Sequence, residues 1–294
     1  MAEFAVTTSD LTKQYGETMA LAGVSLQVRR GSVYGLVGPN GAGKTTLLGV
    51  LAGLRPLTGG SYSIDARRIG VLPDTPTFDP WLTAFEVVDL ARALDESGVE
   101  EPAVMEALAR VGLADVARRR VGGFSRGMLQ RLGLAATVIG EPELLLLDEP
   151  AAALDPAGRR EVLDIVKALQ GRATVIFSSH ILDDVQQVCD AIGILNHGAL
   201  AYEGTLDDLV ADRGRAIEYR VTTRSDAGAV AERLREAAWI QDVRVDGEAV
   251  IVAAPEARTL EELLIPTLAS LDVPIVSVAP ARRNLEAIFL EVTK

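Results

Sequence analysis

The stretch Gly38-Pro39-Asn40-Gly41-Ala42-Gly43-Lys44-Thr45-Thr46 fits the pattern G-x-x-x-x-G-K-[ST] and follows a strand-like apolar run, Val33 to Val37. Glycines let this loop turn tightly and point its N–H groups inward, and the helix expected from Thr45 to Ala52 adds the positive end of its dipole. Lys44 is expected to reach the β- and γ-phosphates of a nucleotide, and Thr45 to place its hydroxyl on Mg²⁺. A glycine-rich turn that binds nothing can have the same sequence pattern, but the preceding strand favours a nucleotide-binding loop.

Length and composition set the broad class of the protein. The chain has 294 residues, of which 48% are hydrophobic, so we expect one large domain with a sizeable core and a second, smaller one. Its formal net charge of −12 argues against a general nucleic-acid binder, because phosphate contacts need clustered Lys and Arg. The one cysteine, Cys189, is expected to be a small buried apolar residue in a reducing compartment.

Targeting signals are not apparent in the sequence. The start, Met1 to Phe4, lacks a basic segment followed by an apolar one, so we expect no signal peptide. No apolar run approaches the roughly 20 residues that span a bilayer. Any membrane contact is therefore expected to come through a partner.

The pattern of apolar residues predicts an α/β fold. Two short strands, Phe4 to Thr8 and Val24 to Val28, are expected around a polar loop, and after Pro80 strands give way to helices at Ala84 to Leu94, Pro102 to Val111 and Gly127 to Ile139. We interpret this block, about residues 75–140, as a helical insertion between two halves of the core. The second half alternates strands and helices, which predicts a mainly parallel sheet: Leu144 to Leu147, Pro156 to Leu169, Thr174 to Phe177, Ile181 to Cys189 and Ile192 to Leu195.

A separate unit is expected in the last part of the chain, with the domains predicted at residues 1–213 and 214–294. The expected order of its elements is β-α-β-β-α-β, which is that of a ferredoxin-like α+β module, with a hairpin at Asp246-Gly247 and a final helix from Asn284 to Val292. It carries no catalytic motif. Two interpretations stay open for this module: a packing or dimer-bracing appendage, or a regulatory or partner-docking domain.

Two carboxylates follow a strand of four leucines, Leu144 to Leu147. Such a strand suits a position buried on both faces of a parallel sheet, and Pro150 stops it. Asp148 at its carboxyl end is expected near the phosphate loop, where it can hold Mg²⁺ directly or through water. Glu149 can then polarise an attacking water. The two motifs together predict a nucleoside triphosphatase.

The segment Phe124-Ser125-Arg126-Gly127-Met128, followed by Gln130-Arg131-Leu132, identifies a family. It resembles the signature loop, usually Leu-Ser-Gly-Gly-Gln, of the ATP-binding subunits of ABC transporters. Ser125 and Gly127 match that loop, whereas Arg126 replaces its first glycine and Met128 its glutamine. This divergent form is similar to subunits that pair with ABC-2-type permeases. Ser125 can also cap the helix, and the exposed N–H groups there can receive a γ-phosphate.

Other motifs of the family match this sequence at single positions. Leu154 and Asp155 resemble the end of the D-loop, and His180, after Ser178-Ser179, matches the switch histidine that contacts the γ-phosphate. Tyr15 matches the aromatic residue on which adenine stacks. The resemblance thus implies contacts to ATP from Tyr15, Gly38, Pro39, Asn40, Gly41, Ala42, Gly43, Lys44, Thr45, Thr46, Ser125, Arg126, Gly127, Met128 and Asp155, and metal ligation by Thr45, Asp148 and Asp74.

Asp74 marks a departure from the family. The Q-loop glutamine, which senses the γ-phosphate and Mg²⁺, should follow the strand Ile69 to Leu72, but the chain has Pro73-Asp74-Thr75-Pro76 there. A carboxylate can ligate Mg²⁺ or its water but cannot donate an amide hydrogen bond, so Asp74 is a metal-side or coupling candidate. Beyond it, Phe78 to Thr83 carries two aromatics that either pack internally or form a hot spot for the permease.

As a whole, the resemblance covers about Phe4 to Asp212 and implies an ATPase subunit of an ABC-2-type exporter on the cytoplasmic face of the cell membrane. Two cassettes would face head to tail as a homodimer, each closing ATP and Mg²⁺ against Ser125 and Gly127 of the other. Glu149, His180 and Lys44 would be the catalytic residues. Two alternatives stay open: a soluble ABC ATPase acting on ribosomes or DNA, and a regulatory subunit that binds ATP without hydrolysing it.

Overall fold

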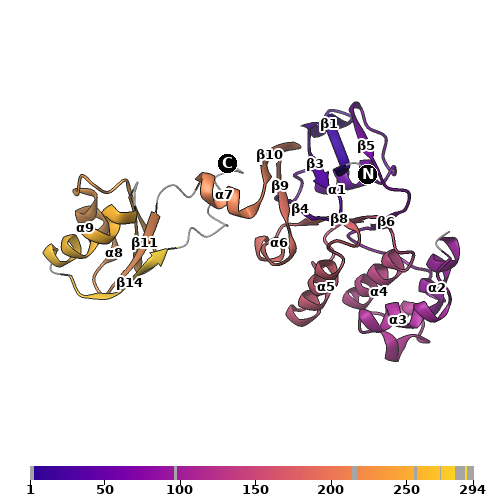
Figure 1. The fold of residues 1–294 in the computed structure, drawn as a ribbon. Helices are drawn as coiled ribbons and strands as arrows, with labels where there is room; N and C mark the ends of the chain where they lie inside the picture. The colour runs from indigo at the N-terminus through magenta and orange to yellow at the C-terminus, as the bar shows by residue number, and fades with distance from the viewer. Residues whose placement is uncertain are drawn as a thin grey trace. The chain divides into compact units, whose positions relative to one another are not determined.

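The computed structural model describes residues 3–95, 98–213, 217–254, 257–271, 273–281 and 289. The chain divides into two units, the first ending at Leu206 and the second beginning at Asp207 (Figure 1). The first unit contains two sheets and six α-helices among its described residues. None of the helices in the described ranges is both long enough and apolar enough to cross a lipid bilayer.

An antiparallel sheet begins the first unit. It consists of β1 (Phe4–Tyr15), β2 (Thr18–Val24), β3 (Gln27–Arg29) and β5 (Gly59–Ile64), with β1 pairing with each of the others. The expectation of a polar loop after Thr8 was wrong, because β1 and β2 extend through this segment. Thr8 explains how polar residues are accommodated: its buried hydroxyl donates to the Val24 carbonyl and accepts the Leu26 N–H, each at 2.9 Å.

The second sheet places the candidate functional residues. It runs in the order β10-β9-β4-β8-β7-β6, where all neighbours are parallel except β9 and β10. Its strands are β4 (Val33–Val37), β6 (Ile69–Leu72), β7 (Leu144–Leu147), β8 (Thr174–Ser179), β9 (Ala191–Asn196) and β10 (Ala199–Gly204). Because parallel strands end at the same edge, the loops after β4, β7 and β8 lie together there.

Strand β10 was not anticipated from the sequence. It follows β9 through a two-residue turn in which His197 and Gly198 have φ angles of 46° and 79°. Positive φ at both central residues is the geometry of a type I′ hairpin, which Asn and Gly favour. Asn196-His197-Gly198 therefore carried the signal for this hairpin, in which His197 is a turn residue.

Helices flank and extend the parallel sheet. Three of them, α2 (Ala84–Leu94), α3 (Pro102–Arg110) and α4 (Arg126–Val138), pack on one another between β6 and β7 in the chain (Figure 1). The helices α1 (Lys44–Leu51), α5 (Pro156–Ala168) and α6 (Leu182–Val188) each follow a strand of the parallel sheet. The α2–α4 block is the observed counterpart of the expected helical insertion.

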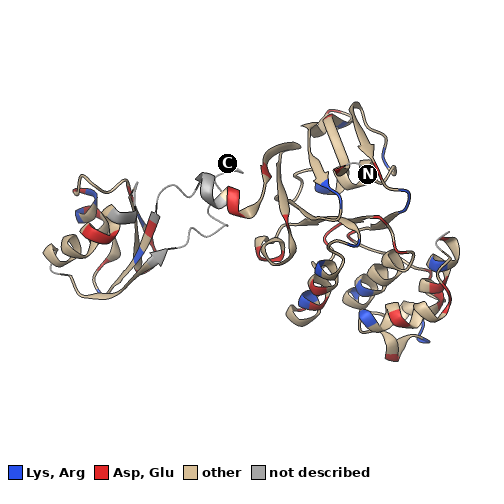
Figure 2. Ribbon diagram, in the orientation of Figure 1, with Lys and Arg blue, Asp and Glu red and all other residues tan. Residues whose placement is uncertain are grey.

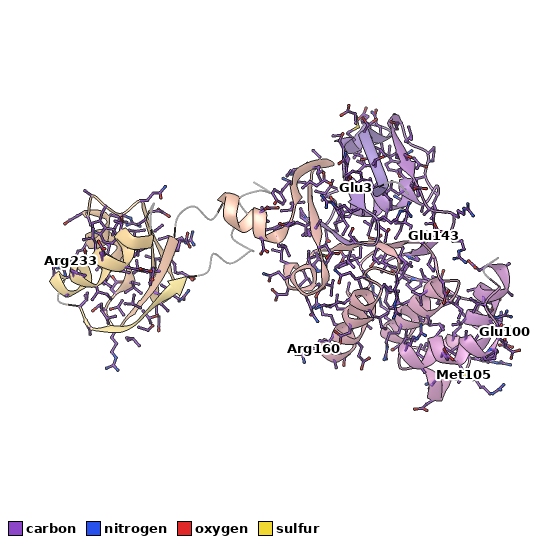
Figure 3. The ribbon with its side chains drawn as sticks, viewed as in Figure 1. Glu3, Glu100, Met105, Glu143, Arg160 and Arg233 are labelled. Carbon is purple, nitrogen blue, oxygen red and sulfur yellow. The ribbon has the colours of Figure 1, made fainter. Side chains whose placement is uncertain are left out.

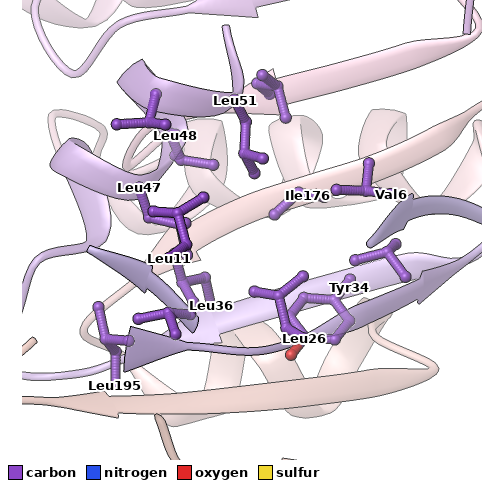
Figure 4. Close-up of a cluster of buried hydrophobic side chains, with 14 of the residues drawn as sticks. Val6, Leu11, Leu26, Tyr34, Leu36, Leu47, Leu48, Leu51, Ile176 and Leu195 are labelled. Atoms are coloured by element: carbon purple, nitrogen blue, oxygen red, sulfur yellow. The ribbon is translucent and has the colours of Figure 1, made fainter. Parts of the chain in front are cut away.

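Side chains from both sheets and α1 form one apolar core (Figure 4). Leu11 of β1, Leu36 of β4, Leu47 of α1 and Ile176 of β8 are all buried in it. Since β4 passes through this core, the phosphate loop that follows it is anchored at its start. Burial of apolar area of this kind is the main favourable term in folding.

Charged side chains of both signs are interspersed on the helices (Figure 2). On α5, for instance, Arg159 and Arg160 are followed by Glu161 and Asp164, and Figure 3 shows Arg160 among the side chains of this helix. Interspersed charges of this kind differ from the clustered Lys and Arg side chains with which proteins bind nucleic-acid phosphates.

Cys189 lies just after α6, against β4. A Cβ atom on Gly35 would come within 2.7 Å of the Cys189 sulfur, so the thiol requires a glycine at that position. Burial, followed by the nearby carboxylates of Asp190 and Asp184, raises the pKa of the Cys189 thiol far above its ordinary value. The half-buried thiol is therefore less readily ionised than that of an exposed cysteine.

This environment predicts that Cys189 is unreactive in the folded protein. Only the thiolate attacks disulfide reagents, so we expect modification at pH 8 to be at least about tenfold slower than in the urea-unfolded chain. A kinetic titration with a chromogenic disulfide measures this directly, since the chain has one cysteine. Equal rates for the native and unfolded chains would show that the thiol is neither buried nor protonated.

The second unit is an α+β module. Helix α7 (Leu206–Arg213) leads into β11 (Ile217–Thr223), α8 (Ala227–Arg235), β12 (Asp242–Asp246), β13 (Ala249–Ala254), α9 (Ala257–Ser270) and β14 (Ile275–Ala281). The sheet is antiparallel in the order β12-β13-β11-β14. Its core includes Val221, Val250 and Leu264. The helix expected from Asn284 to Val292 lies, apart from Phe289, outside the described residues.

Candidate nucleotide-binding site

The phosphate loop joins β4 to α1 and can be built only with glycine at two of its positions. Gly43 has φ = 108°, and a Cβ there would lie 2.6 Å from the Ala20 carbonyl oxygen. A Cβ on Gly38 would lie 2.3 Å from the Leu195 carbonyl oxygen. Both distances are shorter than any real carbon–oxygen contact, so a side chain would displace the loop from the sheet.

Lys44 is the first residue of α1 and is buried within this loop. Its Nζ donates hydrogen bonds to the carbonyl oxygens of Gly38, at 2.7 Å, and Pro39, at 3.3 Å. The loop thus folds back over its own lysine and holds a positive charge at the amino end of α1, where the helix dipole also attracts anions.

The carboxyl end of β7 holds two acidic residues in different settings. Asp148 is buried; its N–H donates to the Leu72 carbonyl at 2.8 Å, and its Oδ1 accepts the Ser178 hydroxyl at 2.6 Å. Glu149 has φ = 48°, a left-handed backbone conformation that is uncommon outside glycine. Its N–H donates to the Ser178 hydroxyl oxygen at 2.8 Å. The chain therefore turns sharply after β7 and directs the Glu149 side chain away from the strand.

The Glu149 carboxylate bridges two other predicted residues. Its Oε1 lies 3.4 Å from Lys44 Nζ, and its Oε2 lies 2.9 Å from His180 Nδ1. The side chains of Lys44 and Glu149 are 6% and 14% exposed, whereas that of His180 is 44% exposed. A cation, a carboxylate and an imidazole from the loops after β4, β7 and β8 thus meet in one place.

These groups line a cavity of about 370 Å³. The residues around it come from the phosphate loop, from the ends of β6, β7 and β8, and from β2: Ala20, Asn40, Gly41, Ala42, Gly43, Lys44, Thr45, Thr46, Asp74, Glu149, Ala152 and His180. Asp74, the residue at the Q-loop position, therefore lies at the same cavity as the phosphate loop. A cavity of this volume is within the range of small-molecule sites.

The donor set of the cavity fits a nucleotide with Mg²⁺. Lys44 and the N–H groups at the start of α1 suit phosphate oxygens, while Thr45, Asp74 and Glu149 offer oxygen atoms. Within the described ranges, no group of three or more His, Cys, Asp and Glu side chains forms a metal cage. Mg²⁺ usually keeps several waters and binds through one or two carboxylates together with substrate phosphates.

The signature residues lie elsewhere in the chain. Ser125 caps α4, because its side chain accepts the Met128 N–H at 3.3 Å, and Asp155 caps α5 by accepting the Gly158 N–H at 3.0 Å. A Cβ on Gly127 would lie 3.0 Å from a methyl carbon of Leu154, so the two segments pack closely. Neither Asp155 nor any residue of Ser125 to Met128 lines the cavity of the same chain.

Tyr15 is also not among the residues that line the cavity. Its ring lies beneath Lys13, with 4.7 Å between Nζ and the ring centroid, and its hydroxyl oxygen is 3.4 Å from an Arg55 guanidinium nitrogen. The ring is 44% exposed. An exposed aromatic face beside two cations can accept a planar base by stacking.

The structure adds residues that sequence reasoning did not single out. Ser178 contacts both acidic residues of the site, and Ala20 and Ala152 line its wall. Ser178 carried a signal, since a polar residue at the end of an apolar strand and two positions before His180 needs a hydrogen-bond partner. The two alanines carried none, because only the tertiary fold brings them to the cavity.

The segment from Phe78 to Thr83 lies beside a second cavity, of about 390 Å³, which is lined by Phe78, Val71, Gly133 and other residues of β6 and α4. Trp81 is 71% exposed, so it does not pack in the interior of this unit. Of the two interpretations of this segment, internal packing is therefore wrong for Trp81.

Comparison with known proteins confirms the family. Residues 21–152 match the family described as ABC transporter. The chain is 43% identical over 209 residues to "Uncharacterized ABC transporter ATP-binding protein YxlF" of Bacillus subtilis, covering 68% of this chain and 70% of that protein. It is 35% identical to "Daunorubicin resistance ATP-binding protein DrrA3" of Streptomyces coeruleorubidus, covering 100% of this chain and 97% of that one.

A solved structure shares the cassette fold. It is a dimeric post-hydrolysis state of the ATP-binding cassette MJ0796 bound to ADP and Pi, with a TM-score of 0.63 and 25% identity, over 68% of this chain and 98% of that one. The chain belongs to the ATP-binding proteins of the ABC transporters, ATPases that use ATP with Mg²⁺ to drive transport through a separate membrane permease.

Proposed function

We propose that the cavity is one half of a composite ATP site and that the residues around it have different roles in ATP hydrolysis. The single observation that carries this proposal is the meeting of Lys44, Glu149 and His180 at the phosphate loop. When bound, ATP with Mg²⁺ supplies the reacting phosphoryl group and the divalent charge that neutralises its oxygens.

Each residue has a role that its chemistry suits. Glu149 orients a water molecule and takes its proton as that water attacks the γ-phosphorus and the bond to the β-phosphate oxygen breaks. Lys44 and His180 stabilise the charge that develops on the phosphate oxygens. Thr45 and Asp148 hold Mg²⁺, directly or through water, and Asp74 contributes a carboxylate on the same side.

The other half of the site comes from a second ATP-binding subunit. In our proposal, Ser125, Arg126, Gly127 and Met128 of that copy close on the γ-phosphate, and Asp155 lies at the contact between the two cassettes. Support comes from the helix cap at Ser125, which leaves N–H groups of the first turn free to bind an anion. Tyr15 stacks on adenine beside Lys13. Because ATP bridges both copies, its hydrolysis releases the closed dimer and shifts the permease between states.

The permease is an ABC-2-type exporter, and the chain works at the cytoplasmic face of the cell membrane. Exposed Trp81 and the cavity beside Phe78 offer the permease an apolar contact. The cargo we propose is a drug-like small molecule, since a relative named for daunorubicin resistance aligns over the whole chain. The second unit braces the dimer or docks a partner.

Co-expression with the membrane proteins encoded by neighbouring reading frames tests this proposal. We expect one polytopic protein to co-purify in detergent, and ATP hydrolysis to be stimulated when both are reconstituted in liposomes. The Trp81→Ala variant should weaken that association, while Leu54→Ala, at another exposed apolar residue, should not. Retention of full ATPase activity without any membrane partner bound would instead point to a soluble factor.

A further inference from the structure

We propose that Ser178 is a positioning residue for ATP hydrolysis, whose hydroxyl fixes the metal-side carboxylate of Asp148 and the backbone turn at Glu149 at the same time. The inference rests on the proposed roles of Asp148 and Glu149, and it adds a residue to which the motifs of the sequence assign no function. It follows from two hydrogen bonds that converge on one oxygen atom.

The geometry fixes which way each hydrogen bond points. The Glu149 N–H lies 2.8 Å from Ser178 Oγ and can only donate. The one hydroxyl proton is therefore left for Asp148 Oδ1, at 2.6 Å, and that oxygen must accept. The result is a directed chain of N–H, O–H and carboxylate, in which each hydrogen bond polarises the next.

The register of the sheet makes this contact obligatory. Strands β7 and β8 are parallel, with Leu147 opposite Phe177, so the next pair along the strands brings Asp148 beside Ser178. Ser178 is fully buried and, on its other side, pairs with Leu36 of β4. A buried hydroxyl that lacked partners would destabilise the fold, so its two bonds are part of what allows a polar residue there.

The bond to Glu149 also supports an unfavourable backbone conformation. A residue with a side chain and a φ near 48° is held there by its surroundings, and the bond from its N–H to Ser178 is one such restraint. The turn directs the Glu149 carboxylate to Lys44 and His180. Without the Ser178 hydroxyl, Asp148 can rotate about its side-chain torsions and the turn loses a restraint.

Ser178→Ala removes both bonds and leaves the methylene of the side chain in place. Losing a group that orients a metal ligand commonly lowers activity or metal affinity by about 10- to 100-fold, and we expect a fall of that size in kcat. The dissociation constant for ATP in the absence of metal should change by less than about threefold, because the phosphate loop is untouched. Ser178→Thr keeps the hydroxyl and should restore most of the activity.

Thr174→Val is the matched control. Thr174 lies at the other end of β8, is equally buried, and its hydroxyl accepts the Gly31 N–H at 3.0 Å. The substitution deletes a buried hydroxyl of the same strand far from the cavity. It should lower the melting temperature slightly and leave kcat and the metal dependence unchanged.

Two measurements do not depend on turnover. Hydrogen exchange of the peptide that contains Glu149, in the nucleotide-free protein, should be faster in Ser178→Ala and unchanged in Thr174→Val. Mn²⁺ binding with a non-hydrolysable ATP analogue, followed by electron paramagnetic resonance, should be about 10- to 100-fold weaker in Ser178→Ala. If Ser178→Ala does not fold, Ser178→Cys, with a thiol that donates weakly, takes its place in every measurement.

The proposal is overturned if Ser178→Ala matches Thr174→Val in kcat, in Mn²⁺ affinity and in exchange at Glu149. It is also overturned if Ser178→Thr fails to restore activity while folding normally. The experiment separates this failure from that of the proposed function. If Asp148→Asn and Glu149→Gln hydrolyse ATP normally, the assigned roles are wrong, whereas inactivity of both with a normal Ser178→Ala refutes only the inference about Ser178.

Discussion

Glu149→Gln is expected to slow ATP hydrolysis by about 10²- to 10⁴-fold, which is the usual contribution of a general base. The amide keeps the shape of the carboxylate but cannot take a proton from water at neutral pH. It also loses the ionic contact with Lys44 Nζ, 3.4 Å away, so Lys44 becomes free to face the phosphates. ATP should therefore bind at least as tightly as in the wild type and should hold the closed dimer together.

Single-turnover hydrolysis and size-exclusion chromatography with ATP measure the two parts of this prediction. Glu143→Gln is the matched control, because Glu143 lies just before the same strand, β7, at the opposite end from Glu149, and does not line the cavity. It should hydrolyse ATP at the wild-type rate and should not form ATP-stable dimers. Unchanged turnover in Glu149→Gln would exclude Glu149 as the residue that activates water.

Lys44→Ala should lower the affinity for ATP by about 10- to 100-fold, because charge-assisted hydrogen bonds are each worth about 1.5–3 kcal/mol and tenfold corresponds to about 1.4 kcal/mol. Lys44 is the buried cation of the phosphate loop. Its ammonium group neutralises the carboxylate of Glu149, next to where the phosphates of ATP are expected to bind. Without it, the Glu149 carboxylate would repel the incoming nucleotide. Hydrolysis of any ATP that does bind should fall as well, since charge on the γ-phosphate loses a partner.

Isothermal titration with ATP and Mg²⁺ measures this affinity. Lys167→Ala, in the last turn of α5 and exposed, removes a lysine that lines no part of the cavity, and it should bind ATP like the wild type. An unchanged dissociation constant for Lys44→Ala would mean that the nucleotide binds elsewhere on the chain.

Much of the fold could be predicted from local patterns. The strand of four leucines, the helix from Ala84 to Leu94 and the strand from Ile69 to Leu72 were all located correctly at both ends. Their signals are short-range. A run of apolar residues marks a strand that is buried on both faces, and α2 is marked by apolar residues at helical spacing that follow the capping residue Thr83. Other helices ended within a few residues of their expected bounds.

The wrong predictions came where a polar sequence lies in a strand. Residues 9–23 read as a loop because Ser9, Asp10 and Lys13 break the apolar pattern, yet they pair across β1, β2 and β5. Register shifts in β1 and the positive φ at Asp10 let the strand include polar residues without burying them away from hydrogen-bond partners. Long-range pairing of this kind leaves almost no trace in a short window of sequence.

The sequence by itself determined that the chain binds a nucleoside triphosphate, since the loop from Gly38 to Thr46 needs its glycines and lysine wherever it occurs. Only the tertiary structure decided that Glu149 touches both Lys44 and His180, and that Ser178 joins Asp148 to Glu149. These contacts depend on the order β4-β8-β7 in the sheet and on the register of its strands. The physical reason is that a motif specifies local backbone geometry, whereas the meeting of distant motifs is set by which strands pair and where they end.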